Sequence, residues 1–165
     1  MTITCFWLLI PILIFNVAFS RFLPSHFQPR IWGQFPRCLS ILENSFRFGV
    51  MLCTLFLPCT FPDSTLKMVG LCLFIIGVSM YFCSWFCVIR YPLSAWSRSL
   101  AGFSAPSWTP ILWFGGIDIL SSWSHMKHAV LFQVVYTALI FHFLLLHNFH
   151  AFWIYKHHKQ TAALF

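Results

Sequence analysis

Histidine is the residue type in this sequence that offers the most chemistry, and its distribution along the chain is uneven. The chain has 8 histidines, and all but one of them lie after residue 124. His147 and His150 are three positions apart, so a helix places their imidazole rings on adjacent turns, where both could bind one divalent metal ion. Two side chains do not complete a coordination sphere. A metal site here therefore requires further ligands from elsewhere in the chain.

His142 lies within a long apolar run and is expected inside a bilayer, where an ionisable side chain is costly and indicates a functional residue. Such an imidazole can bind the iron of haem b or carry a proton. The spacing of Ser94 and Arg98 resembles that of the quinone site in the haem-b anchor subunits of succinate dehydrogenase. Ser97 stands where those subunits have histidine. The resemblance implies a quinone-binding hypothesis for Ser94 and Arg98. Together with His142, they are the candidate residues for binding haem or quinone.

Asp118 is the one acidic residue that we expect within a membrane segment. It follows Gly115 and Gly116, and the missing side chains of these glycines permit close helix packing. Its candidate partners near the same membrane boundary are Lys127, His125 and His128. We expect an intramembrane ion pair at Asp118, with proton transfer or substrate binding as the alternative.

The composition places these residues in a membrane protein. Of the 165 residues, 59% are hydrophobic and 8% are charged, whereas a soluble globular domain typically has about 25% charged residues. The sequence predicts a single all-α domain, a polytopic bundle of about five transmembrane helices, because each crossing needs roughly 20 apolar residues. The predicted helices cover residues 4–19, 48–61, 68–89, 103–123 and 129–155. Pro58 in the second segment leaves a re-entrant helix open there.

The positive charges predict how the bundle is oriented. With five crossings, one orientation places eight cations on the cytoplasmic side and only Lys67 and Lys127 outside, as the positive-inside rule requires. The cytoplasmic group consists of Arg21, Arg30, Arg37, Arg47, Arg90, Arg98, Lys156 and Lys159. We therefore expect the N-terminus outside, the C-terminus inside and a cytoplasmic loop over residues 20–47. The first helix is expected to stay uncleaved, since no Lys or Arg precedes it.

The net charge of +7 is spread singly between apolar runs, which indicates contact with anionic lipid headgroups and argues against a nucleic-acid partner. The membrane itself, bacterial inner or organellar, is left open. Three acidic residues provide little material for acid–base catalysis, so an enzymatic activity is not favoured. We expect an accessory or assembly component that binds other membrane subunits. The alternatives are a haem-binding or quinone-binding anchor of a redox complex, and a metal or proton transporter.

Overall fold

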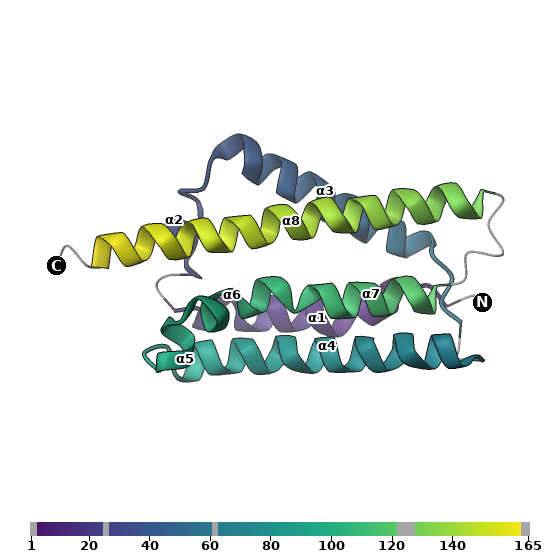
Figure 1. Ribbon diagram of the computed structural model, residues 1–165, viewed down its shortest axis with the longest axis horizontal. Helices are drawn as coiled ribbons and strands as arrows, with labels where there is room; N and C mark the ends of the chain where they lie inside the picture. The colour runs from purple at the N-terminus through teal and green to yellow at the C-terminus, as the bar shows by residue number, and fades with distance from the viewer. Residues whose placement is uncertain (1–2, 25–26, 61–62, 122–127, 163–165) are drawn as a thin grey trace.

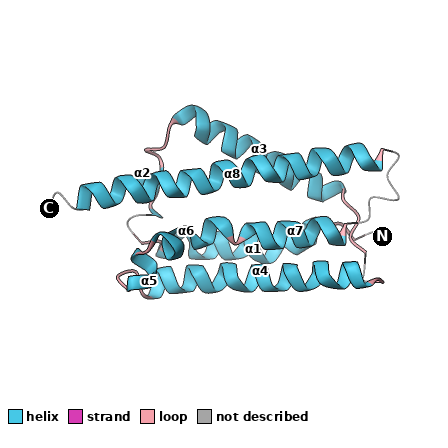
Figure 2. Cartoon of the chain, in the orientation of Figure 1, coloured by secondary structure: helices cyan, strands magenta, loops and turns pink. Residues whose placement is uncertain are grey.

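The computed structural model describes residues 3–24, 27–60, 63–121 and 128–162, with side chains as far as residue 157. This part of the chain is helical and contains no strand, only isolated β-bridges (Figure 2). The predicted all-α class is therefore confirmed. The helices are α1 (Phe6–Phe19), η1 (Ser20–Phe22), α2 (Pro29–Trp32), α3 (Arg37–Phe56), α4 (Thr65–Arg90), α5 (Ala95–Arg98), α6 (Leu100–Trp108), α7 (Pro110–Leu120) and α8 (Ala129–Ala162).

The longer helices lie along a common axis. Helices α3 and α8 form one side of the bundle, and α1, α4 and α7 form the other (Figure 1). Helix α1 begins at the end of the bundle where α4 and α8 also begin, and α8 finishes at the opposite end. A buried apolar core lies between the two sides, and its fully buried members include Cys5, Val50, Ile117 and Tyr136.

Three helices are long and apolar enough to cross a membrane. They are α3, α4 and α8, the last of these counted over Ala129–His157. Helix α1 with η1 forms a shorter apolar helix, Phe6–Phe22. In the length and composition of its helices, the structure thus agrees with a membrane protein.

The predicted boundaries are best for the most apolar segments. The segments 4–19 and 68–89 correspond to α1 and α4 with differences of at most a few residues, and 129–155 corresponds to the first part of α8. The segment 103–123 becomes two helices, α6 and α7, which meet at Thr109 and Pro110. Proline has no backbone N–H and cannot continue the hydrogen-bond ladder of α6, so a new helix starts there.

The segment 48–61 is wrong at both ends. Helix α3 starts at Arg37 and finishes at Phe56, so the predicted cytoplasmic loop over residues 20–47 is helical from Arg37 onward. Two charged residues of this part of the sequence, Glu43 and Arg47, lie within the helix. They lie four positions apart in α3 and form an ion pair, with 2.8 Å between Oε1 and Nη2, which removes much of the penalty for placing them in an apolar helix.

Glycine allows α4 and α7 to approach each other closely. A Cβ atom added to Gly116 would lie 2.6 Å from the backbone nitrogen of Phe74, and one added to Gly77 would lie 2.6 Å from that of Trp113. Only a residue without a side chain fits such contacts. The close approach expected at Gly115 and Gly116 is confirmed for Gly116, whereas a Cβ on Gly115 would meet nothing within 4 Å.

Candidate functional site

The main polar cluster of the molecule is centred on Glu43 of α3. Its side chain is 3% exposed, and both of its carboxylate oxygens are hydrogen bonded. Oε1 accepts hydrogen bonds from Arg47 Nη2 at 2.8 Å and from His147 Nδ1 at 2.7 Å. Oε2 lies 2.7 Å from His150 Nδ1. We call these four residues, Glu43, Arg47, His147 and His150, the Glu43 cluster.

Helix geometry and aromatic packing together position the cluster. His147 and His150 are three residues apart on α8, so both rings face the same neighbouring helix, α3. The His150 ring stacks on Phe35, with 4.0 Å between ring centroids, and on Trp32 at 4.7 Å. The His147 ring stacks on Phe143 at 5.3 Å. These contacts fix the rings around the carboxylate.

The hydrogen-bond partners of His150 define its proton count. Its Nε2 lies 2.9 Å from the carbonyl oxygen of Trp32, which can only accept, so Nε2 carries a proton. The second contact, from Nδ1 to Glu43, then holds one shared proton. Imidazolium with carboxylate and imidazole with carboxylic acid both satisfy this geometry, and both give the pair no net charge. Because the Arg47 guanidinium stays protonated, the cluster as a whole carries at least one positive charge.

The same distances bear on the metal hypothesis for His147 and His150. Two ligands that each lie about 2.1 Å from one tetrahedral zinc ion are roughly 3.4 Å apart, whereas both Nδ1 atoms lie 2.7 Å from Glu43. At this separation the groups hydrogen bond directly to each other. Within the described part of the chain, no group of three or more His, Cys, Asp or Glu side chains is arranged to hold a metal ion.

The structure places the candidate haem and quinone residues apart. His142 is exposed on α8, where Nδ1 lies 2.7 Å from the carbonyl oxygen of Ala138 and the ring stacks on Phe46. Ser94 caps α5 by accepting a hydrogen bond from Ser97 N. The carbonyl oxygen of Arg98 accepts a hydrogen bond from Tyr155, 13 residues beyond His142 on α8 and so roughly 20 Å further along the helix axis. The three residues do not form one site.

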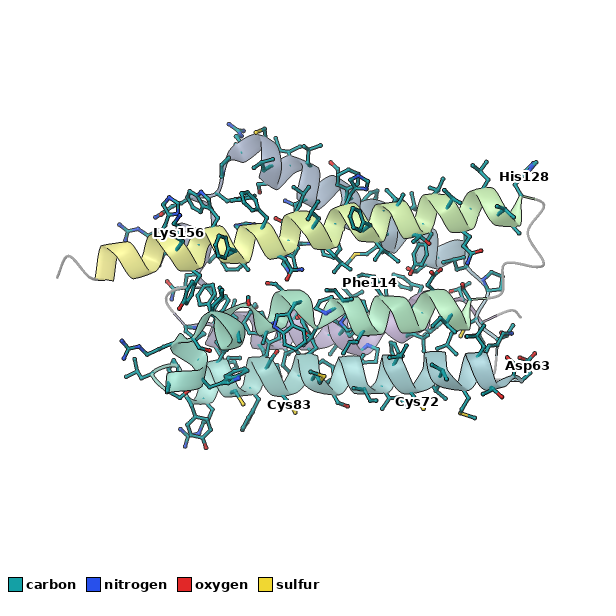
Figure 3. All side chains as sticks on the ribbon, in the orientation of Figure 1. Asp63, Cys72, Cys83, Phe114, His128 and Lys156 are labelled. Atoms are coloured by element: carbon teal, nitrogen blue, oxygen red, sulfur yellow. The ribbon has the colours of Figure 1, made fainter. Side chains whose placement is uncertain are left out.

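Asp118 lies on α7 and faces α8. The Thr137 hydroxyl donates a hydrogen bond of 3.5 Å to Asp118 Oδ2. Two of the expected ion-pair partners, His125 and Lys127, lie outside the described residues. The third, His128, is exposed at the start of α8, at the same end of the bundle as Asp63 (Figure 3).

A thiol pair lies at that same end. Cys5 N donates to Leu57 O and Cys59 N donates to Ile3 O, both at 2.8 Å, so the start of α1 pairs with the loop after α3. A hydrogen bond from the Cys5 thiol and the charge of Lys67 lower the pKa of Cys59 from 9.0 to about 7, although partial burial of Cys59 opposes the shift. Cys59 is therefore largely a thiolate just above neutral pH.

Glu43 is the site residue that sequence analysis missed. The one signal for it was the spacing of Glu43 and Arg47, which is typical of an ion pair on one helix face, but it lay in a segment assigned to a loop. The pairing of His147 with His150 was recognised, and the additional group that they need comes from a residue more than a hundred positions earlier.

No protein-family model matches this chain, and neither the curated proteins nor the solved structures give a match to it. The fold and the Glu43 cluster describe the class of protein. The described part of the chain is helical, three of its helices are apolar and of membrane-spanning length, and two of these helices, α3 and α8, hold the Glu43 carboxylate between them.

Proposed function

We propose that this chain is a multi-pass integral membrane protein that serves as an accessory or assembly component of a membrane complex. One observation carries the proposal. Only 17% to 22% of the residues in the three candidate spans are buried within the chain, so most of their apolar surface faces outward. Lipid tails or the apolar helices of other subunits must cover that surface.

The proposal includes five crossings, with α1 and the combined α6 and α7 as the additional two. It also places the N-terminus outside and the C-terminus inside. These helices lie along the same axis as α4 and α8, with α1 running in their direction and α7 in the opposite one, which supports this count (Figure 1). The orientation is supported by Arg90 and Lys156, which lie toward one end of the bundle, and by Asp63 at the other end (Figure 3).

The Glu43 cluster supports an accessory role over a catalytic one. Each oxygen of its carboxylate is already hydrogen bonded to a side chain of the same protein. A carboxylate held in this way stabilises the packing of α3 on α8. General acid–base catalysis needs a carboxylate within hydrogen-bond reach of a substrate.

The test is purification of the tagged full-length chain in a mild detergent, with three measurements on one sample. These are the size of the particle, the oxidised and dithionite-reduced absorption spectra, and the metal content. We expect a colourless, metal-free protein in stoichiometric association with larger membrane subunits. A monodisperse particle that contains this chain alone contradicts the accessory role.

Each alternative function predicts a different result for the purified protein, in solution or in liposomes. A Soret band that disappears in His142→Ala supports a haem-binding anchor. A stoichiometric metal that is lost in His147→Ala supports a metal site. Proton or metal flux into liposomes that Asp118→Asn abolishes supports a transporter.

A further inference from the structure

A cavity of about 460 Å³ lies among the helices of the bundle, next to the Glu43 cluster. Residues from α1, α3, α4, α6, α7 and α8 all contribute to its wall. This volume is within the range of about 300–1,000 Å³ that is typical of small-molecule sites. Aromatic rings such as those of Phe15, Trp85 and Phe143 form much of the wall, so the occupant must be largely apolar.

The polar groups on this wall are mostly hydrogen-bond donors. Arg47 has five N–H donors, and its hydrogen bond to Glu43 uses one nitrogen. Trp113 is 6% exposed, and its indole N–H is buried with no partner among the described residues. Asn16 accepts a hydrogen bond of 2.6 Å from Tyr81 through its carbonyl oxygen, which leaves its amide as a donor. A ligand that matches this wall presents acceptors.

The net charge of the Glu43 cluster narrows the class of ligand further. Glu43 carries at most one negative charge and shares it between Arg47, at 2.8 Å, and His150, so the cluster as a whole keeps a net positive charge next to the cavity. The other two acidic residues do not supply the balance. Asp63 lies at the far end of the bundle (Figure 3), and Asp118 lies on the last turn of α7 at that same end. The Arg47 side chain is 38% exposed and keeps further donors beside its ion pair with Glu43, so an anionic ligand in the cavity can balance the remaining positive charge of the cluster.

We propose that the cavity binds a long-chain carboxylate, such as a free fatty acid. The planar carboxylate pairs with the Arg47 guanidinium, whose fork of donors matches its two oxygens, and the alkyl chain lies against the aromatic wall. Asn16 and Trp113 supply further donors on the same wall. This site is separate from the accessory role, because it needs no partner subunit.

The test uses the tryptophans of the cavity wall, Trp32, Trp85 and Trp113, as reporters. The full-length protein in phosphatidylcholine nanodiscs is titrated with stearate brominated at mid-chain, which quenches tryptophan fluorescence on contact. The methyl ester of the same acid is the control ligand, since it enters the bilayer equally but has no charge. We expect saturable quenching by the acid, with half-saturation at a concentration about tenfold lower than for the ester.

Three variants test whether Arg47 and the cavity bind the acid. Arg47→Gln is expected to raise the half-saturation concentration of the acid about tenfold and so remove its advantage over the ester. Arg90→Gln removes a cation that does not line the cavity, and we expect binding unchanged. The double variant Leu13→Phe/Met51→Phe narrows the cavity and keeps Arg47, so the half-saturation concentration of the acid should rise even if Arg47→Gln does not fold.

Three outcomes overturn the assignment: equal quenching by acid and ester, wild-type affinity in folded Arg47→Gln, and wild-type affinity in the variant with the narrowed cavity. A decyl-substituted quinone that displaces the acid at lower concentration than unlabelled stearate shows instead that the site prefers a neutral carbonyl compound. A negative result leaves the association with other subunits untouched, because that measurement does not involve the cavity.

Discussion

At the scale of single residues, the buried carboxylate of Glu43 forms hydrogen bonds to three other side chains. Arg47, His147 and His150 all contact it, and each would lose its main polar partner without the charge. Breaking one side of a buried ion pair costs about 3–5 kcal/mol, because the remaining charge has no compensation.

We therefore predict that Glu43→Gln lowers the free energy of unfolding by about 3 kcal/mol. The amide keeps the size of the side chain but cannot accept hydrogen bonds on both of its ends. Unfolding by sodium dodecyl sulfate in mixed micelles measures the change. Asp63→Asn is the matched control, since the Asp63 side chain is 72% exposed, and its expected effect is within about 0.5 kcal/mol.

Cys59 gives a second prediction at this scale. With its pKa lowered to about 7, its alkylation by iodoacetamide should rise with pH through about 7 and then level off. Peptide mapping by mass spectrometry follows this one thiol among the seven cysteines. A thiol with the ordinary pKa of 9.0 would still be gaining reactivity at pH 8.

Variants of its neighbours separate the two causes. Cys5→Ala removes the thiol donor, so the midpoint of the Cys59 profile should move to higher pH, whereas Cys5→Ser keeps a donor and should retain most of the shift. Lys67→Gln removes the nearby positive charge and should also raise the midpoint. If all three variants gave the pH profile of the wild-type protein, neither Cys5 nor Lys67 would set the pKa of Cys59.

At the scale of helices, the contact between α4 and α7 depends on glycine. Gly116→Ala forces a Cβ into the backbone of Phe74, so we predict a loss of about 1–3 kcal/mol in the free energy of unfolding. Gly115→Ala is the adjacent control. It meets open space, and the better helix propensity of alanine should leave stability equal or raise it by up to about 1 kcal/mol.

The sequence predicted helices where apolar residues are continuous and failed where polar residues occur in the interior. The segment that became α4 has no acidic residue, and its predicted range of 68–89 is close to Thr65–Arg90. The first half of α3 contains Glu43 and Arg47, and hydropathy assigned it to a loop. Its partners on α8 are distant in sequence, so no local pattern could show that these charges are neutralised.

The candidate site was predictable to a similar degree. The spacing of His147 and His150 indicated a pair on one helix face, and the structure shows that pair. The grouping of His142 with Ser94 and Arg98 required knowledge of how α5 and α8 lie relative to each other. Periodicity within a helix does not contain that information, because it describes one element at a time.

At the scale of the whole molecule, the number of crossings is open to a direct test. Five crossings place residues 63 and 128 on the same outer side, whereas spanning by α3, α4 and α8 alone places them on opposite sides. We predict that Asp63→Cys and His128→Cys both gain labelling by a membrane-impermeant maleimide in intact cells. The exposed native Cys38, near the start of α3, should react only after permeabilisation.

The pairing of α3 with α8 also sets an order of events during synthesis. Glu43 precedes His150 by 107 residues, so at about 5–20 residues per second the ribosome delivers the imidazoles roughly 5–20 seconds after the carboxylate. Helix α4 and helix α7 can assemble during that interval, since they follow each other closely in the chain. Arg47, one turn from Glu43 on the same helix, is available from the start and keeps the acid neutralised until α8 arrives.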